Sequence, residues 1–183
     1  MTFGELLALL VGLLERSRVP YIVTGSLASS YHGEPRATRD VDIVIDPTDE
    51  ALDRLTESLH DAGFDVDRDV AREALTRRTQ FNAIGPDGTK VDFIIRRDRP
   101  FSLEEPRRRQ PADLLGTPGY VASAEDVILA KLEWARETGS DRQLDDIAGI
   151  VAIASELDIE YIDRWAASLG VEDDWRTIRE DAR

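Results

Sequence analysis

Three aspartates in two apolar segments of the chain could together bind a metal ion. Asp40 and Asp42 belong to the run DVDIVI at positions 40–45, and Asp92 belongs to the run VDFII at positions 91–95. Because side chains alternate between the two faces of a strand, Asp40 and Asp42 would lie on one face, about 7 Å apart. Like charges at that distance are costly unless a cation lies between them. If the second strand lies beside the first, Asp92 joins them.

Carboxylate ligands without histidine or cysteine select Mg²⁺ or Mn²⁺. The chain has no cysteine, and its two histidines, His32 and His60, are not at a metal-ligand spacing. Two divalent ions held by Asp40, Asp42 and Asp92 could clamp the attacking and leaving oxygens of a phosphoryl transfer. The alternative is that the three acids lie on a solvated sheet face, where acids are common.

The segment TGS at positions 24–26 could bind the phosphates that such a reaction needs. It follows an expected short strand at 21–23 and precedes a small-residue helix at 27–31, with Ser26 as the predicted N-cap. Gly25 would let the backbone approach an anion closely, and the N–H groups at a helix start favour negative charge. The alternative is a turn and a cap without a ligand.

The rest of the chain predicts a mixed sheet with helices, followed by a helical tail. A helix is expected from Phe3 to Arg16, where leucines recur every three or four residues. Residues 100–118 contain four prolines and no clean period, which predicts a surface connector. The other expected elements are a helix at 49–62, strands at 79–84 and 90–95, and helices at 123–138, 141–155, 159–168 and 172–181.

This order of elements predicts the α/β (α+β) fold class, with a mixed sheet flanked by helices. Residues 1–100 would form the α/β core, and residues 101–183 a connector and helical C-terminal part, together one compact unit. The net charge of −14 argues against a general nucleic-acid coat protein. The apolar start lacks a positive n-region and a cleavage site, so we expect a first helix of a cytoplasmic protein without a membrane partner.

The glycine motif, the paired aspartates and the later single aspartate resemble the nucleotidyltransferase superfamily of DNA polymerase beta. The matching pieces are VTGS at 23–26, DVD at 40–42 and VDF at 91–93. Within that superfamily the chain is most similar to AbiEii-like and MenT-like nucleotidyltransferase toxins. The resemblance covers most of the chain from about Tyr21 to Ile153, and it implies the nucleotidyltransferase fold.

The expected helices at 123–138 and 141–155 carry the narrower resemblance. They match an ED-L-x-x-K pattern that ends at Lys131 and a K-D-x-x-D pattern that ends at Asp146, with a departure at Gln143. The resemblance implies that Lys131 binds nucleotide phosphates and that Asp146 is the acid of the second helix. Lys131 also lies on an apolar face of its expected helix. Its ammonium group therefore either has a partner or reaches solvent because the side chain extends past that face. Arg39 is a further candidate for holding phosphates or a base.

The resemblance implies a metal-dependent transfer of a nucleoside monophosphate from an NTP to a hydroxyl or phosphate acceptor. Asp40 and Asp42 would hold Mg²⁺ or Mn²⁺, while Asp92 would complete the metal shell and help to deprotonate the acceptor. Ser26 and Lys131 would hold the triphosphate.

The acceptor stays open between RNA or tRNA, a protein and a small molecule. A toxin role would bring in a cognate antitoxin as partner. Two further alternatives are a non-catalytic nucleotide- or partner-binding module with the same fold, and a small-molecule modifier such as an antibiotic nucleotidyltransferase.

Overall fold

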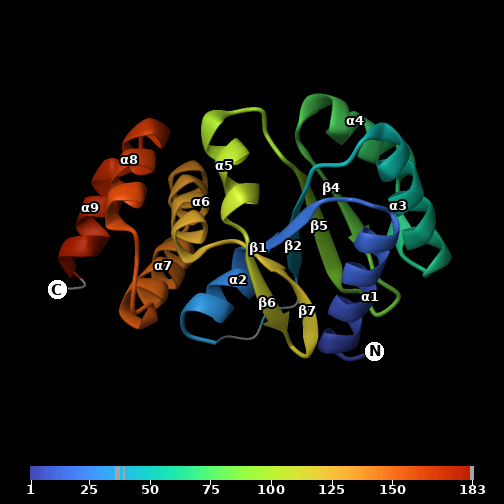
Figure 1. Ribbon diagram of the computed structural model, residues 1–183, viewed down its shortest axis with the longest axis horizontal. Helices are drawn as coiled ribbons and strands as arrows, with labels where there is room; N and C mark the ends of the chain where they lie inside the picture. The colour runs from blue at the N-terminus through green and yellow to red at the C-terminus, as the bar shows by residue number, and fades with distance from the viewer. Residues whose placement is uncertain (36–37, 39, 182–183) are drawn as a thin grey trace. The chain divides into compact units, whose positions relative to one another are not determined.

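The computed structural model describes residues 1–35, 38 and 40–181. By its internal contacts the chain divides into two compact units (Figure 1). Unit 1 comprises Met1–Thr24 and Thr38–Val121, and unit 2 comprises Gly25–Ala37 and Ala122–Arg183. From the sequence we expected the α/β core to end near residue 100. The observed boundary between the units falls near residue 121, and one early helix belongs to unit 2.

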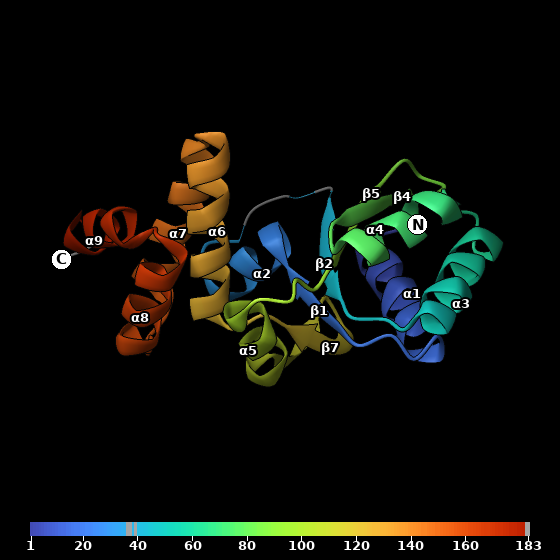
Figure 2. The same cartoon turned by 90° about the horizontal axis from the view of Figure 1, so that it is seen from above.

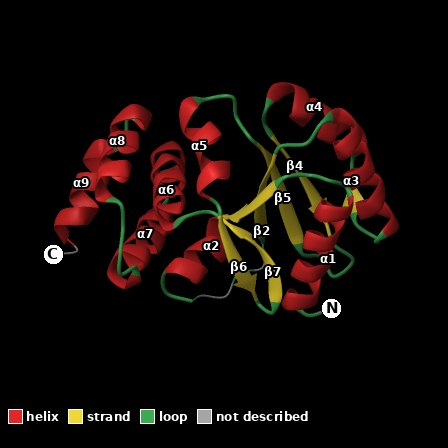
Figure 3. Ribbon diagram, viewed as in Figure 1, coloured by secondary structure: helices red, strands yellow, loops and turns green. Residues whose placement is uncertain are grey.

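The described residues of unit 1 contain a mixed sheet of seven strands in the order β3-β4-β5-β2-β1-β7-β6. Its strands are yellow in Figure 3. β2 and β5 pair in parallel, although two strands and two helices separate them in the chain. The aspartate-bearing strands are therefore neighbours, as the metal hypothesis requires. The strand bounds are β1 Tyr21–Thr24, β2 Val41–Ile45, β3 Asp65–Val66, β4 Gln80–Ile84, β5 Lys90–Ile95, β6 Gln110–Leu114 and β7 Thr117–Val121.

Helices α1 (Phe3–Arg16), α3 (Asp49–Asp61) and α4 (Arg68–Arg77) lie on one face of the sheet (Figure 2). Alternation along the strands turns Val41, Ile43, Val91 and Phe93 to this face, where each is at most 1% exposed. Phe93 also stacks on Phe81, with the ring centroids 5.1 Å apart. This apolar face fixes which side of β2 and β5 carries the aspartates.

The prediction of a connector at 100–118 is wrong, because this segment folds into helix α5 (Pro100–Arg108) and the hairpin β6–β7. Two of the four prolines lie where proline is tolerated: Pro100 is in the first turn of α5, and Pro111 is on the edge strand β6. Pro106 is inside α5, and Pro118 is in β7. The hairpin turns through Leu115 and Gly116, both with positive φ. A leucine in that conformation is uncommon, which is why no turn motif was visible.

Unit 2 is helical, and it includes α2 although that helix follows β1 directly in the chain. α2 packs against α6 and α7. The backbone of Gly33, after the end of α2, comes so close to α7 that an added Cβ would lie 2.8 Å from the backbone nitrogen of Ile150. The helix bounds are α2 Gly25–His32, α6 Ala124–Thr138, α7 Asp141–Ile153, α8 Ile159–Leu169 and α9 Glu172–Asp181.

Across the described residues, no helix combines the length and the hydropathy that a bilayer crossing needs.

We predict that Gly33→Ala destabilises unit 2 by about 2 kcal/mol, because the added methyl group would overlap the α7 backbone. Gly149→Ala is the matched control, since its Cβ would have no neighbour closer than 3.7 Å and alanine favours a helix interior. Urea unfolding followed by tryptophan fluorescence measures the effect, because Trp134, Trp165 and Trp175 all belong to unit 2. Equal stability of the two variants would contradict the close contact.

Candidate active site

Asp42 and Asp92 lie side by side on neighbouring strands of unit 1. They are direct register partners in the parallel β2–β5 pair, so their side chains point to the same face of the sheet. The same cross-strand row continues to Thr24 on β1 and Asn82 on β4. This face is opposite to the one covered by α1, α3 and α4, because Asp42 and Asp92 alternate with buried apolar neighbours. The condition that the two acid-bearing strands are neighbours is therefore met, and the metal-binding role of these acids stays a prediction.

Asp40 lies just outside the strand. β2 begins at Val41, one residue later than the sequence suggested, and Asp40 is exposed. Its backbone carbonyl accepts a hydrogen bond of 3.2 Å from the hydroxyl of Thr38. We define the carboxylate cluster as Asp40, Asp42 and Asp92, of which the last two are held by the sheet and the first is in the preceding loop.

Lys90 is a member of this site that the sequence analysis missed. It is two residues before Asp92 on β5 and therefore on the same face, and its Nζ donates a hydrogen bond of 2.8 Å to Asp92 Oδ2. This hydrogen bond raises the pKa of Lys90, and the negative charges of Asp92, Asp40 and Asp42 raise it further. The ammonium group is thus within electrostatic reach of the whole carboxylate cluster. The spacing Lys-x-Asp in a strand was the signal that could have identified it.

The carboxylate cluster fits a divalent ion in its donor chemistry. Asp92 Oδ1 is buried and has no hydrogen-bond partner among the described residues, so one ligand oxygen is left for a cation. In the described part of the chain, however, no three acidic or imidazole side chains are already gathered as metal ligands. Metal binding by Asp40, Asp42 and Asp92 therefore stays a prediction.

The glycine motif forms the first turn of α2 in unit 2. The helix starts at Gly25, immediately after β1, so Ser26 is inside the first turn and not at the N-cap as predicted. Gly25 has a φ of 61°, a left-handed conformation that other residues adopt only with strain. Its carbonyl accepts a hydrogen bond of 2.9 Å from the Ser29 hydroxyl. Arg39 falls outside the described residues.

Lys131 and Asp146 form a buried ion pair between α6 and α7. Lys131 Nζ donates to Asp146 Oδ2 at 2.7 Å and to Gln143 Oε1 at 2.8 Å. The side chains of Lys131 and Asp146 are 6% and 7% exposed. Of the two alternatives for Lys131, a partner or an extension into solvent, the structure shows the first. Gln143, where the sequence departs from the expected pattern, also binds the lysine.

The two acids at the start of α6 are also buried. The backbone N–H of Asp158 donates to Glu125 Oε1 at 3.0 Å, and the Tyr161 hydroxyl donates to Asp126 Oδ1 at 2.7 Å. Both bonds connect α6 to the start of α8. The ED-L-x-x-K segment therefore anchors three helices of unit 2 to one another.

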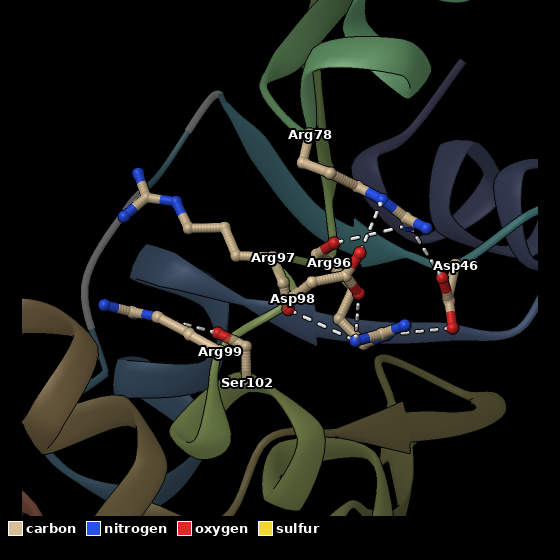
Figure 4. A network of polar contacts seen from close by, with 7 residues as sticks. All are labelled: Asp46, Arg78, Arg96, Arg97, Asp98, Arg99 and Ser102. Carbon is tan, nitrogen blue, oxygen red and sulfur yellow. Dashed lines mark hydrogen bonds and ion pairs between the residues drawn. The ribbon is translucent and has the colours of Figure 1, made fainter.

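An ion-pair network in unit 1 joins the far ends of the aspartate-bearing strands (Figure 4). Asp46, which follows β2, accepts from Arg96 Nε at 2.9 Å and from Arg78 Nη1 at 3.2 Å. Arg96 follows β5 and also pairs with Asp98 at 3.2 Å. The side chain of Arg97 points away from this network (Figure 4). Because the network ties β2 to β5, it supports the register that sets Asp42 beside Asp92.

Comparison with known proteins identifies a family for most of the chain. The family model for aminoglycoside-2''-adenylyltransferase matches residues 6–126. No curated protein matches the sequence.

Several solved structures share the nucleotidyltransferase fold with this chain. The crystal structure of ANT(2'')-Ia with adenylyl-2''-tobramycin has 16% sequence identity and a TM-score of 0.65 over 92% of this chain and 97% of that chain. The lincomycin-bound adenylyltransferase LnuA has 16% identity and a TM-score of 0.56 over 84% and 98%. An antigenic nucleotidyltransferase-like protein from Paracoccidioides brasiliensis has 18% identity and a TM-score of 0.57 over 96% and 90%.

We predict that Asp146→Asn lowers the free energy of unfolding of unit 2 by about 3 kcal/mol, because it leaves the buried Lys131 ammonium without its counter-charge. Asp145→Asn removes the same charge from the exposed neighbouring position and should change stability by less than about 0.5 kcal/mol. Urea unfolding followed by tryptophan fluorescence compares the two variants. A loss of similar size in both would show that the ion pair contributes little.

Proposed function

Because the chain belongs to the aminoglycoside-2''-adenylyltransferase family of nucleotidyltransferases, we propose that it transfers AMP from ATP to a hydroxyl group of a small-molecule acceptor and releases pyrophosphate. The observation that carries this proposal is the in-register pair of Asp42 and Asp92 on neighbouring strands. Two carboxylates at one level of a sheet are costly for stability, and catalysis gives a reason to keep them.

The carboxylate cluster would perform the chemical step. Asp40 and Asp42 would hold Mg²⁺ or Mn²⁺, and Asp92 would bind the ion next to the acceptor and accept the proton of the attacking hydroxyl. The buried Asp92 Oδ1 without a partner is available for such a contact. When bound, the metal would offset the phosphate charge and make the acceptor hydroxyl more acidic. The α-phosphorus would receive the acceptor oxygen as the bond to pyrophosphate breaks.

The nucleotide-binding residues are proposed from the family resemblance. The backbone at Gly25 and Ser26 is at the positive end of α2, where a helix favours phosphate oxygens. Lys131 would add a positive charge for the phosphates, and Asp146 would orient its ammonium group through the 2.7 Å ion pair. Arg39, which lies outside the described residues, remains a proposed contact for the phosphates or the base.

The charge of the chain favours a cationic acceptor over a nucleic acid. With a net charge of −14 the average field of the protein repels phosphates and attracts amines. RNA binding normally depends on many Lys and Arg contacts to phosphate. An amine-bearing hydroxyl compound, such as the aminoglycoside in the complex with ANT(2'')-Ia, is the acceptor class that fits best.

The narrower resemblance to AbiEii-like and MenT-like toxins remains a hypothesis. It rests on Lys131 and Asp146, and it would imply an RNA or protein acceptor and a cognate antitoxin. A cytoplasmic location suits either role, because both consume NTP. A non-catalytic binding module is the less favoured alternative, because all three aspartates of the carboxylate cluster are present.

A transfer assay separates these functions. The protein is incubated with Mg²⁺ and α-labelled ATP together with aminoglycosides, lincosamides, total tRNA or a protein extract. Label on a small amine-bearing acceptor supports the proposal, and label on tRNA or protein supports the toxin hypothesis. If no acceptor is labelled and ATP with Mg²⁺ does not raise the melting temperature, the non-catalytic module is favoured.

We predict that Asp42→Asn lowers the transfer rate on the order of 10³-fold, because it removes one of the charges that would hold the metal ion. Its melting temperature in EDTA should equal or exceed that of the wild type, since the mutual repulsion of Asp42 and Asp92 is relieved. Asp65→Asn, on the exposed edge strand β3 of the same sheet, is the matched control and should keep full activity. Normal turnover of Asp42→Asn would refute the assignment.

A further inference from the structure

Lysine occurs at only two positions in the chain, and each lysine donates to an aspartate of its own unit. The chain has 23 Lys and Arg residues in total, of which Lys90 and Lys131 are the lysines. Lys131 pairs with Asp146, and Lys90 pairs with Asp92. Every other basic residue is an arginine. A lysine ammonium is a compact charge on a flexible stem, whereas an arginine holds a carboxylate by a planar fork that is harder to displace.

The position of Lys90 is that of a cation serving the whole carboxylate cluster. Its Nζ is 2.8 Å from Asp92 Oδ2, and the charges of Asp92, Asp40 and Asp42 all raise its pKa. The Lys90 side chain is 42% exposed, so it can leave Asp92 and reach water by rotating its stem. The Asp92 side chain is only 13% exposed and stays in place.

We propose that Lys90 is an internal counter-cation at Asp92 and competes with the divalent metal ion for this carboxylate. In the metal-free protein the ammonium group compensates the paired carboxylates. A divalent ion at Asp92 Oδ1 would repel the ammonium group bound to Oδ2 of the same carboxylate, so metal binding weakens the Lys90 contact. Lys90 thereby sets the metal concentration at which the enzyme is loaded. This inference rests on the metal use in the proposed function and adds a residue that controls it.

The test measures metal affinity without nucleotide. Protein stripped with EDTA is titrated with Mn²⁺, and free Mn²⁺ is followed by electron paramagnetic resonance. Lys90→Met should bind Mn²⁺ about fivefold more tightly than the wild type, because the competing cation is gone. Lys90→Gln should behave in the same way. Arg77→Met is the matched control: it removes one positive charge and an ion pair from an exposed site on α4, and it should leave the Mn²⁺ affinity within twofold of the wild type.

A second measurement is the melting temperature with and without Mn²⁺. In EDTA, Lys90→Met should melt at a lower temperature than Arg77→Met, and Mn²⁺ should raise its melting temperature more than that of the wild type. Unchanged or weaker Mn²⁺ binding by both Lys90 variants would overturn the role of Lys90, as would a raised KM for ATP with unaltered Mn²⁺ affinity.

The same titration distinguishes this failure from a failure of the metal-dependent function. If neither the wild type nor the Lys90 variants bind Mn²⁺, the proposed metal site is refuted, and the proposed competition between Lys90 and the metal ion is refuted as well. If the wild type binds Mn²⁺ and Asp42→Asn does not, Mn²⁺ binds at the carboxylate cluster. In that case, a Lys90→Met variant with the same Mn²⁺ affinity as the wild type contradicts only the proposed role of Lys90.

Discussion

The constraint on which the site depends is the direct pairing of two aspartates across neighbouring strands. Parallel strands are about 4.8 Å apart, so the in-register carboxylates of Asp42 and Asp92 are forced close together in a partly buried place. Their repulsion requires a cation. The rest of unit 1 keeps this arrangement in place: the apolar face of β2 and β5 packs under helices, and the Asp46–Arg96 ion pair joins the same two strands beyond their far ends.

The alternation of polar and apolar residues along β2 and β5 made it possible to predict which residues share the sheet face that carries the acids. It sufficed to place Asp42 and Asp92 on the face opposite Val41 and Phe93. It could not specify that β5 pairs with β2. The strands β3 and β4 lie between these two in the sequence, and the parallel pairing depends on how the whole sheet is arranged. From the sequence, this pairing was therefore only a condition of the metal site, and the β2–β5 register meets that condition. Lys90 was visible by the same alternation but carried no motif to draw attention to it.

Other features could not be predicted because tertiary packing overrides local signals. The prolines of residues 100–118 suggested a connector, yet the first turn of a helix accepts Pro100 and an edge strand accepts Pro111, and the segment folds even with Pro106 inside α5. The assignment of α2 to unit 2 is also invisible in the sequence, since α2 follows β1 without a linker. It results from packing, because α2 buries Leu27 and Ala28 and meets α7 at a contact that only a glycine at position 33 permits.

The two lysine pairs differ in exposure, and this difference separates their roles. Lys131 and Asp146 are 6% and 7% exposed, so breaking their pair would leave a charge buried, and the pair works as a fixed connection between α6 and α7. Lys90 is 42% exposed, so its ammonium group can return to water at little cost when a stronger cation arrives. The buried pair Lys131–Asp146 is therefore permanent. The pair Lys90–Asp92 is exchangeable, because only its aspartate is buried. Because the Lys90 ammonium group is exchangeable, it can compensate the negative charge of Asp92 while the sheet folds. It can then give way to a metal ion at the same carboxylate.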